Sequence, residues 1–415
     1  MILGDYSFGI GDRFGQQGEA LLAAIIEAGR AGVEVTPVWN KSHREHTLIG
    51  TKPAAVRVEA QSAADSMMWE GVYFVDADHI NLKNVDNFIE SCDFFTLDAA
   101  DFIGRPAPRE DVDNFIEGAE RYIEGSVLSE ISDNLTVGED LVRAIAGRYL
   151  AAIKEAGKLY RHIVAKKGVS NFITELSIDE AQAAQTPIEL FFILAAVSRE
   201  EIPIQTIAPK FSGRFNKGVD YEGDIERFAR EFEQDLRAIE FAKREFGLPA
   251  NLKISVHSGS DKFSIYGAIN RAIKKFGAGL HVKTAGTTWL EEVAGLALSG
   301  GEYLEIAKKI YEGAYSRIDE LTKPYAEVID IDRDKLPLPE VVAEWGAKKF
   351  DDELRHDESS GRYNPNFRQL LHLGYKIAAE MGKEFIDAAA ECKRIIGPNV
   401  TENIYQRHIK PIFIE

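Results

Sequence analysis

Carboxylate and imidazole side chains stand where several short apolar segments of this sequence end. Asp78 and His79 follow one such segment, Glu175 lies at the end of another, and His257 directly follows a third. An Asp-His step at a strand end suits metal-assisted proton chemistry, because the imidazole can hold a divalent cation while the adjacent carboxylate acts as a base. The sequence therefore predicts a metal site that includes His79, with Asp78 as the catalytic base.

A single histidine near a strand end is more often a hydrogen-bonded structural residue than a ligand. Three of them, His79, His257 and His281, stand at different strand ends, and this favours a ligand role at a barrel mouth. Asp76 and Asp98 are compatible with simple capping of the elements that follow them. We expect most of the remaining histidines to be solvated or to cap helices: His43, His46, His162, His356, His372 and His408. His372 would reach the barrel mouth if the C-terminal helices fold over it.

Basic residues also follow the predicted strand ends, although the chain has a net charge of −18. This local excess predicts an anionic substrate that carries a carboxylate or a phosphate. Lys210, Lys262 and Lys283 carry the most weight because they directly follow strands. The whole set is Arg13, Lys41, Arg44, Lys210, Arg214, Lys217, Lys262 and Lys283.

The acidic composition argues against nucleic acid as a partner, because phosphate-backbone binding needs a dense basic face. Cys92 and Cys392 are the only cysteines, which excludes a thiolate metal cage and favours a reducing compartment. A metal held by histidine and oxygen ligands suits Zn, Ni, Co, Mn or Fe(II). The glycines from Gly9 to Gly15 fail the dinucleotide-binding spacing, so we expect no nucleotide cofactor. With no signal segment and no long apolar run, we expect a cytoplasmic protein that has no membrane partner.

Short runs rich in Val, Ile, Phe and Thr alternate with segments of helical period. We count eight strands: Asp5–Ile10, Val33–Trp39, Val72–Ala77, Asp93–Leu97, Phe172–Leu176, Ile204–Ala208, Leu252–Val256 and Leu280–Thr284. The clearest helices are Ala20–Ala31, Glu139–Ala165, Ile188–Ser198, Asp224–Phe246 and Ile265–Phe276. The pattern predicts an α/β fold, a single (β/α)8 TIM-type barrel, with an open doubly wound sheet as the alternative.

We expect the catalytic barrel to span residues 1–305 and a helical C-terminal extension, residues 306–415, to pack on it. A long helical tract runs from Trp289 to about Tyr325. The polar stretch Asp351–Asn366 is expected to be a solvated loop, with a loop that covers the barrel mouth as the alternative. The C-terminal helices are compatible with a flanking or interface layer, and hence with a homo-oligomer.

Five motifs together resemble the tagaturonate/fructuronate epimerase family. They are Ser7–Arg13, Asp76–His79, Gly213–Asp224, Ser255–Ser264 and His281–Thr287. The resemblance implies a metal-dependent barrel that interconverts D-tagaturonate and D-fructuronate, with a related activity at C4 of the neutral sugars tagatose and fructose. A more distant resemblance to class II aldolases assigns His79 and His257 to the metal. Asn216 stands nearest the place of their third histidine, and the epimerase family resembles this with an amide residue there, so the resemblance favours Asn216 as the third metal ligand. His281 is the rival third ligand.

The two uronates differ at a carbon β to the ketone, whose C–H bond the carbonyl does not acidify. We therefore expect inversion by retro-aldol cleavage and re-addition, with Asp78 as the base and Glu175 returning the proton. A class II aldolase-like lyase, a ketose epimerase that abstracts the proton α to the ketone, and a non-catalytic sugar-acid binding protein remain alternatives. The residues expected to bind the keto sugar or keto sugar acid are Arg13, Lys210, Lys217, Lys262, His281, Lys283 and Thr287.

Overall fold

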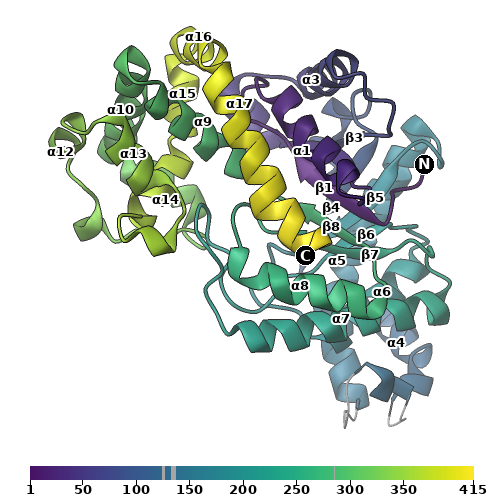
Figure 1. The fold of residues 1–415 in the computed structure, drawn as a ribbon. Helices are drawn as coiled ribbons and strands as arrows, with labels where there is room; N and C mark the ends of the chain where they lie inside the picture. Colours follow the sequence, from purple (N-terminus) through teal and green to yellow (C-terminus); the bar gives the residue numbers. More distant parts are fainter. Residues whose placement is uncertain (124–126, 132–136, 285) are drawn as a thin grey trace.

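Eight parallel strands form a closed barrel in the computed structural model, which describes residues 1–123, 127–131, 137–284 and 286–415 (Figure 1). Each strand pairs with the next along the chain, and the last strand pairs with the first. The predicted (β/α)8 fold is confirmed. The strands are β1 (Tyr6–Ile10), β2 (Thr36–Ser42), β3 (Phe74–Ile80), β4 (Phe94–Asp98), β5 (Ile173–Ser177), β6 (Thr206–Ala208), β7 (Lys253–His257) and β8 (Leu280–Lys283). Ala285, part of one family motif, lies outside the described residues.

Helices surround the barrel, and their ends carry recognisable capping residues. Thr186 and Glu189 form a capping box at the start of α6, and Asp224 caps α7, which ends at the left-handed Gly247. The third strand-to-strand connection contains only a short 3-10 helix, Val85–Asn87. A bilayer-crossing helix is absent from the described ranges. The helices are α1 (Gly18–Arg30), α2 (His43–Ile49), α3 (Pro53–Ser66), α4 (Arg109–Glu117), α5 (Glu139–Lys167), α6 (Pro187–Arg199), α7 (Ile225–Phe246), α8 (Phe263–Phe276) and α9 (Gly286–Ser299).

The barrel interior changes from apolar to polar along the strands. Side chains of a strand alternate between its two faces, so every second residue shares the interior. Near the strand starts, Val38, Phe74, Phe94 and Ile173 form an apolar cluster with Leu3. Two positions further along the same strands stand buried polar residues: Asn40, Asp76, Thr96 and Glu175. The side chains at the C-terminal ends of the strands therefore lie next to a buried polar layer of the barrel interior.

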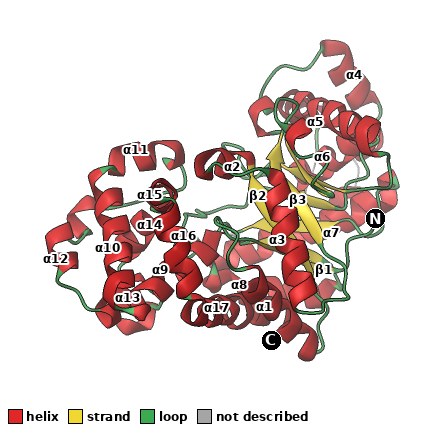
Figure 2. Cartoon of the chain, turned by 90° about the horizontal axis from the view of Figure 1, so that it is seen from above, coloured by secondary structure: helices red, strands yellow, loops and turns green. Residues whose placement is uncertain are grey.

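The C-terminal helices form a lobe beside the barrel, as Figure 2 shows. Phe385 of this lobe packs on Phe14 of the first barrel loop, with ring centroids 4.6 Å apart. The chain then returns along the barrel, where its last residues pack against α1 and α8. The boundary that we expect at residue 305 falls inside α10. The segments are α10 (Gly301–Ser316), α11 (Ile318–Thr322), α12 (Pro339–Ala343), α13 (Ala347–Leu354), α14 (Pro365–Leu373), α15 (Tyr375–Met381), α16 (Lys383–Glu391), α17 (Lys393–Glu402) and a π-helical stretch, Asn403–Ile414.

The stretch Asp351–Asn366 is only in part the solvated loop that its polarity predicts. Its first residues complete α13 and its last residues begin α14, whereas residues 357–362 between them are exposed. His356, between the two helices, is 3% exposed and lies 2.9 Å from the carboxylate of Asp261 in the barrel. The prediction therefore holds for residues 357–362 and is wrong for the ends of the stretch and for His356.

Candidate active site

A cavity of about 950 Å³ opens at the C-terminal ends of the strands. The barrel contributes acidic, basic and imidazole groups to its lining, among them Asp78, His79, Asp98 and His257. The C-terminal lobe contributes the segment 323–328 together with His372 and Tyr375. The cavity is therefore shared between the barrel mouth and the extension, as expected for a site in this class of fold.

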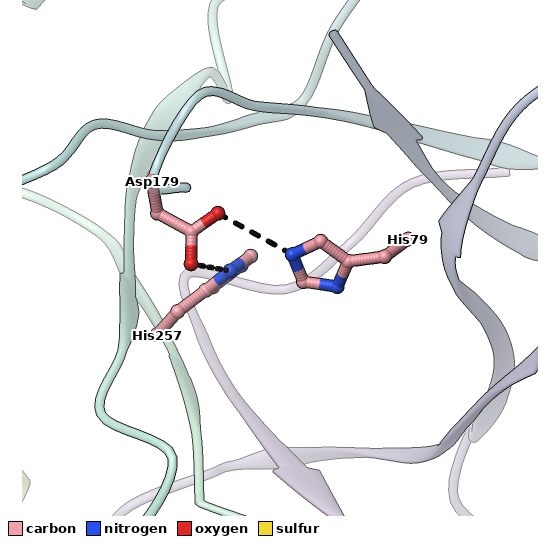
Figure 3. Close-up of side chains that lie close together, drawn as sticks. All are labelled: His79, Asp179 and His257. Carbon is pink, nitrogen blue, oxygen red and sulfur yellow. Dashed lines mark hydrogen bonds and ion pairs between the residues drawn. The ribbon is translucent and has the colours of Figure 1, made fainter. Parts of the chain in front are cut away.

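Two histidines and one aspartate converge in this cavity (Figure 3). Nε2 of His79 lies 3.3 Å from Oδ1 of Asp179, and Nδ1 of His257 lies 3.1 Å from Oδ2 of the same carboxylate. One ligand atom from each residue lies within 4.8 Å of the other two. We call His79, Asp179 and His257 the imidazole cluster. Its nitrogen and oxygen atoms are a ligand set suited to a divalent transition metal.

The other nitrogen of each imidazole is held by a further carboxylate. Nδ1 of His79 lies 3.0 Å from Asp78 Oδ1, and Nε2 of His257 lies 3.0 Å from Glu175 Oε1. Such partners fix the tautomer and orientation of metal-ligating histidines. His79 also has a φ of 51°, a left-handed conformation that costs a non-glycine residue about 1–3 kcal/mol. The strand register shifts between Ala77 and Ile80, so the irregular backbone turns this side chain toward the cluster.

The charges around the imidazole cluster favour positive charge. Burial lowers the pKa of His257, but Asp179 and Glu175 more than compensate and raise it to about 9. Burial likewise lowers the pKa of His79, while Asp78 and Asp179 raise it well above its usual value. An environment that attracts protons to two imidazoles attracts a metal cation for the same reason, so these residues fit a divalent metal.

The ammonium group of Lys283 is surrounded by three carboxylates. Its Nζ is 2.7 Å from Asp76 Oδ2, 2.7 Å from Glu175 Oε1 and 3.0 Å from Asp78 Oδ1. Burial raises the pKa of Asp78, but Lys283 and His79 lower it well below its ordinary value. Lys283 lines the cavity as predicted, yet its charge already compensates these carboxylates. Asp76 is accordingly part of a buried ion network and does not cap a helix.

A different part of the cavity carries an excess of cations. Arg13, Arg44 and Lys217 line it, and we call these three residues the cationic wall. Arg13 lies 4.2 Å from the ring centroid of Tyr375, while Arg44 and Lys217 lie 4.9 and 5.3 Å from that of Tyr325. Burial lowers the pKa of Lys217, and repulsion from Arg44 and Arg13 lowers it further. An anion bound here would relieve this repulsion.

The carboxylates near the cationic wall only partly balance it. Oε1 of Glu45 lies 3.5 Å from Nε of Arg13, and Glu180 is the other acid that acts on Arg44 and Lys217. Three cations thus face two carboxylates. His372 stands beside them, and its pKa is well below normal because of burial and then Arg13 and Lys217. The imidazole of His372 is therefore neutral, and its buried Nδ1 has no partner within the described ranges.

The structure brings some of the predicted substrate-binding residues into the cavity and leaves others out. Arg13, Lys210, Lys217 and Lys283 line it. Lys262, His281 and Thr287 are fully buried away from its lining. Nζ of Lys262 donates to backbone carbonyls, including Asn216 at 3.0 Å and Val219 at 2.8 Å. Thr287 donates to Asp261, and His281 lies 2.9 Å from Ser7 Oγ inside the barrel. These three side chains therefore make structural contacts inside the protein and do not face the cavity.

Asn216 and His281, the two candidates for the third ligand, are both outside the imidazole cluster. The side chain of Asn216 is buried and lies 3.5 Å from Glu222. Asp179 is the third member of the imidazole cluster. The sequence did not predict it, because Asp179 lies two residues beyond the end of β5. A carboxylate just beyond a strand end was the available signal. Tyr325 and Tyr375 gave no such signal, since they belong to the distant extension. His372 lines the cavity, as expected if the C-terminal helices fold over the barrel mouth.

The expectation of solvated or capping histidines was wrong for four of the six. His46, His356, His372 and His408 are buried. His408, for example, is fully buried and lies 2.7 Å from the hydroxyl of Tyr266. The Oδ1 of Asp98 accepts the backbone N–H of Ala100 at 3.0 Å, but Ala99 is the N-cap of the 3-10 helix Ala100–Phe102, so Asp98 does not cap it. It also lines the cavity, and burial raises its pKa.

The chain is similar in sequence to known tagaturonate epimerases. The sequence profile of the tagaturonate epimerase family matches residues 2–385. A tagaturonate/fructuronate epimerase of Thermotoga maritima is 28% identical over 383 residues, which are 89% of this chain and 72% of that protein.

Two glycerol-complexed crystal structures of fructuronate-tagaturonate epimerase from Cohnella laeviribosi share the fold. One has a TM-score of 0.78 and 23% identity, over 98% of this chain and 81% of that chain. The other has a TM-score of 0.80 and 22% identity, over 100% of this chain and 83% of that chain. The similarity includes the C-terminal lobe, because nearly all of this chain is covered.

Proposed function

The chain belongs to the tagaturonate epimerase family, and we propose that it interconverts D-tagaturonate and D-fructuronate in a metal-dependent reaction. The observation that carries this proposal is the pairing, in one cavity, of a ligand set for a cation with an excess of cations for an anion. A keto sugar acid has the matching groups, with its ketone and hydroxyls at one end and its carboxylate at the other. A neutral ketose could use only the first of these two regions.

The imidazole cluster would hold the metal through Nε2 of His79, Nδ1 of His257 and the carboxylate of Asp179. A divalent cation bound there would supply Lewis acidity to the keto oxygen of the substrate. Asp78 and Glu175 would keep the two imidazoles in the required tautomers through their other nitrogens. Glu175 is completely buried, so we propose that it acts through His257 instead of returning a proton to the substrate.

Two carboxyl groups that face the cavity have pKa values pushed in opposite directions. Lys283 keeps Asp78 ionised, whereas burial raises the pKa of Asp98. Such separation is the usual sign of a base and an acid within one site. We propose that Asp78 accepts the proton of the β-hydroxyl as the carbon–carbon bond breaks, and that Asp98 returns a proton after the aldehyde fragment has rotated and the bond has re-formed.

The cationic wall would retain the aldehyde fragment between cleavage and re-addition. That fragment keeps the carboxylate of the uronate. Arg13, Arg44 and Lys217 can hold this carboxylate while the aldehyde group rotates and presents its other face. Retention by charge distinguishes an epimerase from a lyase, which must release both fragments. The neutral sugars lack this anchor, and we expect slower conversion of tagatose than of tagaturonate.

An NMR time course tests this function. Chelator-treated protein and protein reloaded with Zn, Ni, Co, Mn or Fe(II) are each given tagaturonate in deuterated buffer. We expect fructuronate only after reloading, with no deuterium at the carbon α to the ketone. Deuterium at that carbon would indicate proton abstraction instead of retro-aldol cleavage, and free aldehyde trapped in solution would indicate a lyase. Binding of the uronate without any conversion would overturn the proposal.

A further inference from the structure

A second group of potential metal ligands lies outside the cavity, between the barrel and the C-terminal lobe. Asp220 belongs to the long loop between β6 and α7, while His356 and Glu358 follow α13. One imidazole nitrogen and one oxygen from each carboxylate lie within 4.8 Å of one another. None of these residues lines the cavity or takes part in the proposed reaction. Within the described ranges, this is the second of two such groups.

The imidazole of His356 is fixed in place although its partner Glu358 lies at the surface. The ring packs between Phe263 and Tyr363, with centroid distances of 4.9 Å to each, and only 3% of the residue is exposed. Nδ1 lies 2.9 Å from Oδ2 of Asp261. A side chain that is held on both faces and at one nitrogen loses little entropy when its other nitrogen binds a ligand.

The carboxylate of Asp261 orients the imidazole of His356. Its Oδ2 lies 2.9 Å from Nδ1 of His356 and accepts a hydrogen bond from Nη2 of Arg368 at 2.7 Å. With Nδ1 turned to this carboxylate, Nε2 is the nitrogen available to a metal. Nε2 lies 3.9 Å from Oε1 of Glu358, too far for a hydrogen bond. Asp220 contributes a carboxylate oxygen to the same group of potential ligand atoms.

Asp220 is oriented by hydrogen bonds that fall mainly on one of its oxygens. Its Oδ1 accepts the N–H of Tyr221 at 2.6 Å, the hydroxyl of Ser264 at 3.0 Å and the N–H of Ser264 at 3.2 Å. Among the described residues, its Oδ2 accepts only the same N–H of Ser264, at 3.1 Å, so capacity for a ligand remains on Oδ2. The arrangement Asp261–His356–Nε2 repeats the carboxylate–imidazole pattern that supports metal-bound histidines elsewhere.

We propose that Asp220, His356 and Glu358 bind a second divalent cation, of the zinc class, that joins the β6–α7 loop to the C-terminal lobe. With a neutral imidazole, the donor set has a charge of −2 and matches a divalent ion. Atoms that share one zinc ion at about 2.1 Å lie about 3.4 Å apart, so a small rotation of the exposed Glu358 side chain completes the site. Water supplies the fourth ligand.

This ion would act on the active site through the loop that it anchors. The loop spans residues 209–224, and its residues Gly213, Arg214, Phe215 and Lys217 line the cavity. Cross-linking this loop to the segment around His356 restricts the motion of Lys217, a member of the cationic wall. The cation is therefore structural, and its loss should loosen substrate binding while the imidazole cluster stays intact.

Zinc titration of chelator-stripped protein tests this proposal. We use calorimetry with Zn²⁺ and count bound ions by elemental analysis, in wild type and in Glu358→Gln, with Glu340→Gln as a matched control on the exposed surface of α12. We expect one site to weaken roughly tenfold or more in Glu358→Gln and to be unchanged in Glu340→Gln. Glu358 is 73% exposed in its side chain, so its replacement should not impair folding.

A variant that lacks a ligand of the imidazole cluster distinguishes zinc binding at this site from zinc binding in the cavity. In His257→Ala, Zn²⁺ should still bind and raise the melting temperature, and the rise should disappear in the double variant His257→Ala/Glu358→Gln. If His257→Ala binds no zinc, or if the double variant binds it as tightly as His257→Ala does, the proposal is wrong. Neither readout depends on turnover of tagaturonate, so failure of the proposed function would leave this test unaffected.

Discussion

Within the cavity, the imidazole cluster and the cationic wall differ in charge, in origin and in the way they are compensated. The cluster comes from β3, β7 and the segment just after β5, and further carboxylates hold both of its histidines. The cationic wall comes from the loops after β1 and β6 and from the first turn of α2, and aromatic rings of the C-terminal lobe support it. The first region has an excess of negative groups and the second an excess of positive groups.

This difference suits the imidazole cluster to the chemical step and the cationic wall to recognition of the substrate. Groups that perform chemistry need fixed geometry, and the strand ends of a closed barrel provide it. Groups that recognise a carboxylate need charge and an adaptable surface, and the loops with the added lobe provide these. The following predictions would separate the two regions, and they run from the largest expected effect to the smallest.

Removing a ligand of the imidazole cluster should abolish the chemistry. We expect His257→Ala to lower turnover by a factor on the order of 10³, because the polarising cation is lost together with its ligand. The measurement is the rate of fructuronate formation, together with metal content. His162→Ala, on the exposed side of α5, is the matched control and should retain full activity. Turnover above a tenth of wild type in His257→Ala would contradict the assignment.

Removing a charge of the cationic wall should affect the acid and spare the neutral sugar. We expect Lys217→Met to lower kcat/KM for tagaturonate about 10- to 100-fold, the loss of one hydrogen bond to a charged group. Tagatose conversion should change little. Steady-state kinetics on both sugars measure this, with Lys335→Met in the lobe as a control. Equal losses on the two sugars would show that Lys217 does not bind the carboxylate.

Glu175 offers a test of whether it acts through His257 or on the substrate. We expect Glu175→Gln to weaken metal affinity about 10- to 100-fold, because the carboxylate that orients His257 becomes a neutral amide. Turnover measured against metal concentration should recover at high metal. A loss that added metal cannot restore would instead support the proton-returning role that the sequence predicts.

His372 should give the smallest effect, since its neutral imidazole can make one ordinary hydrogen bond to a substrate hydroxyl. We expect His372→Asn to raise KM for tagaturonate about two- to tenfold and to leave kcat unchanged. A melting curve shows whether the replacement also loosens the lobe. A fall in kcat with unchanged KM would place His372 in the chemical step.

The fold could be predicted in outline because its signals are local. Runs such as Phe74–Ala77 and Leu252–Val256 are recognisable as strands from their apolar, β-branched composition, and the alternation of strand and helix implies a parallel barrel. Barrel closure then requires that strand ends meet, so Asp78, His79 and His257 could be placed at one mouth. The family resemblance, drawn from the same strand-end motifs, is confirmed by the match over residues 2–385.

Position near a strand end did not predict correctly which side chains face the cavity. Lys262 follows β7, yet its ammonium group is directed to backbone carbonyls of the neighbouring loop. His281 lies two positions before Lys283 on β8, and this alternation puts it one layer below the mouth. Sequence position near a strand end is therefore a weaker guide than the layer in which a side chain lies.

The sequence by itself determined the barrel, its strand ends and the family, because these depend on patterns that extend over a few residues. Only the tertiary structure decided that Asp179 completes the imidazole cluster and that Tyr325, His372 and Tyr375 share the cavity with Arg13. Those positions depend on how the lobe packs against the barrel, through contacts such as Phe14 with Phe385. No local pattern encodes which apolar surfaces meet, since the hydrophobic effect that joins them is not directional.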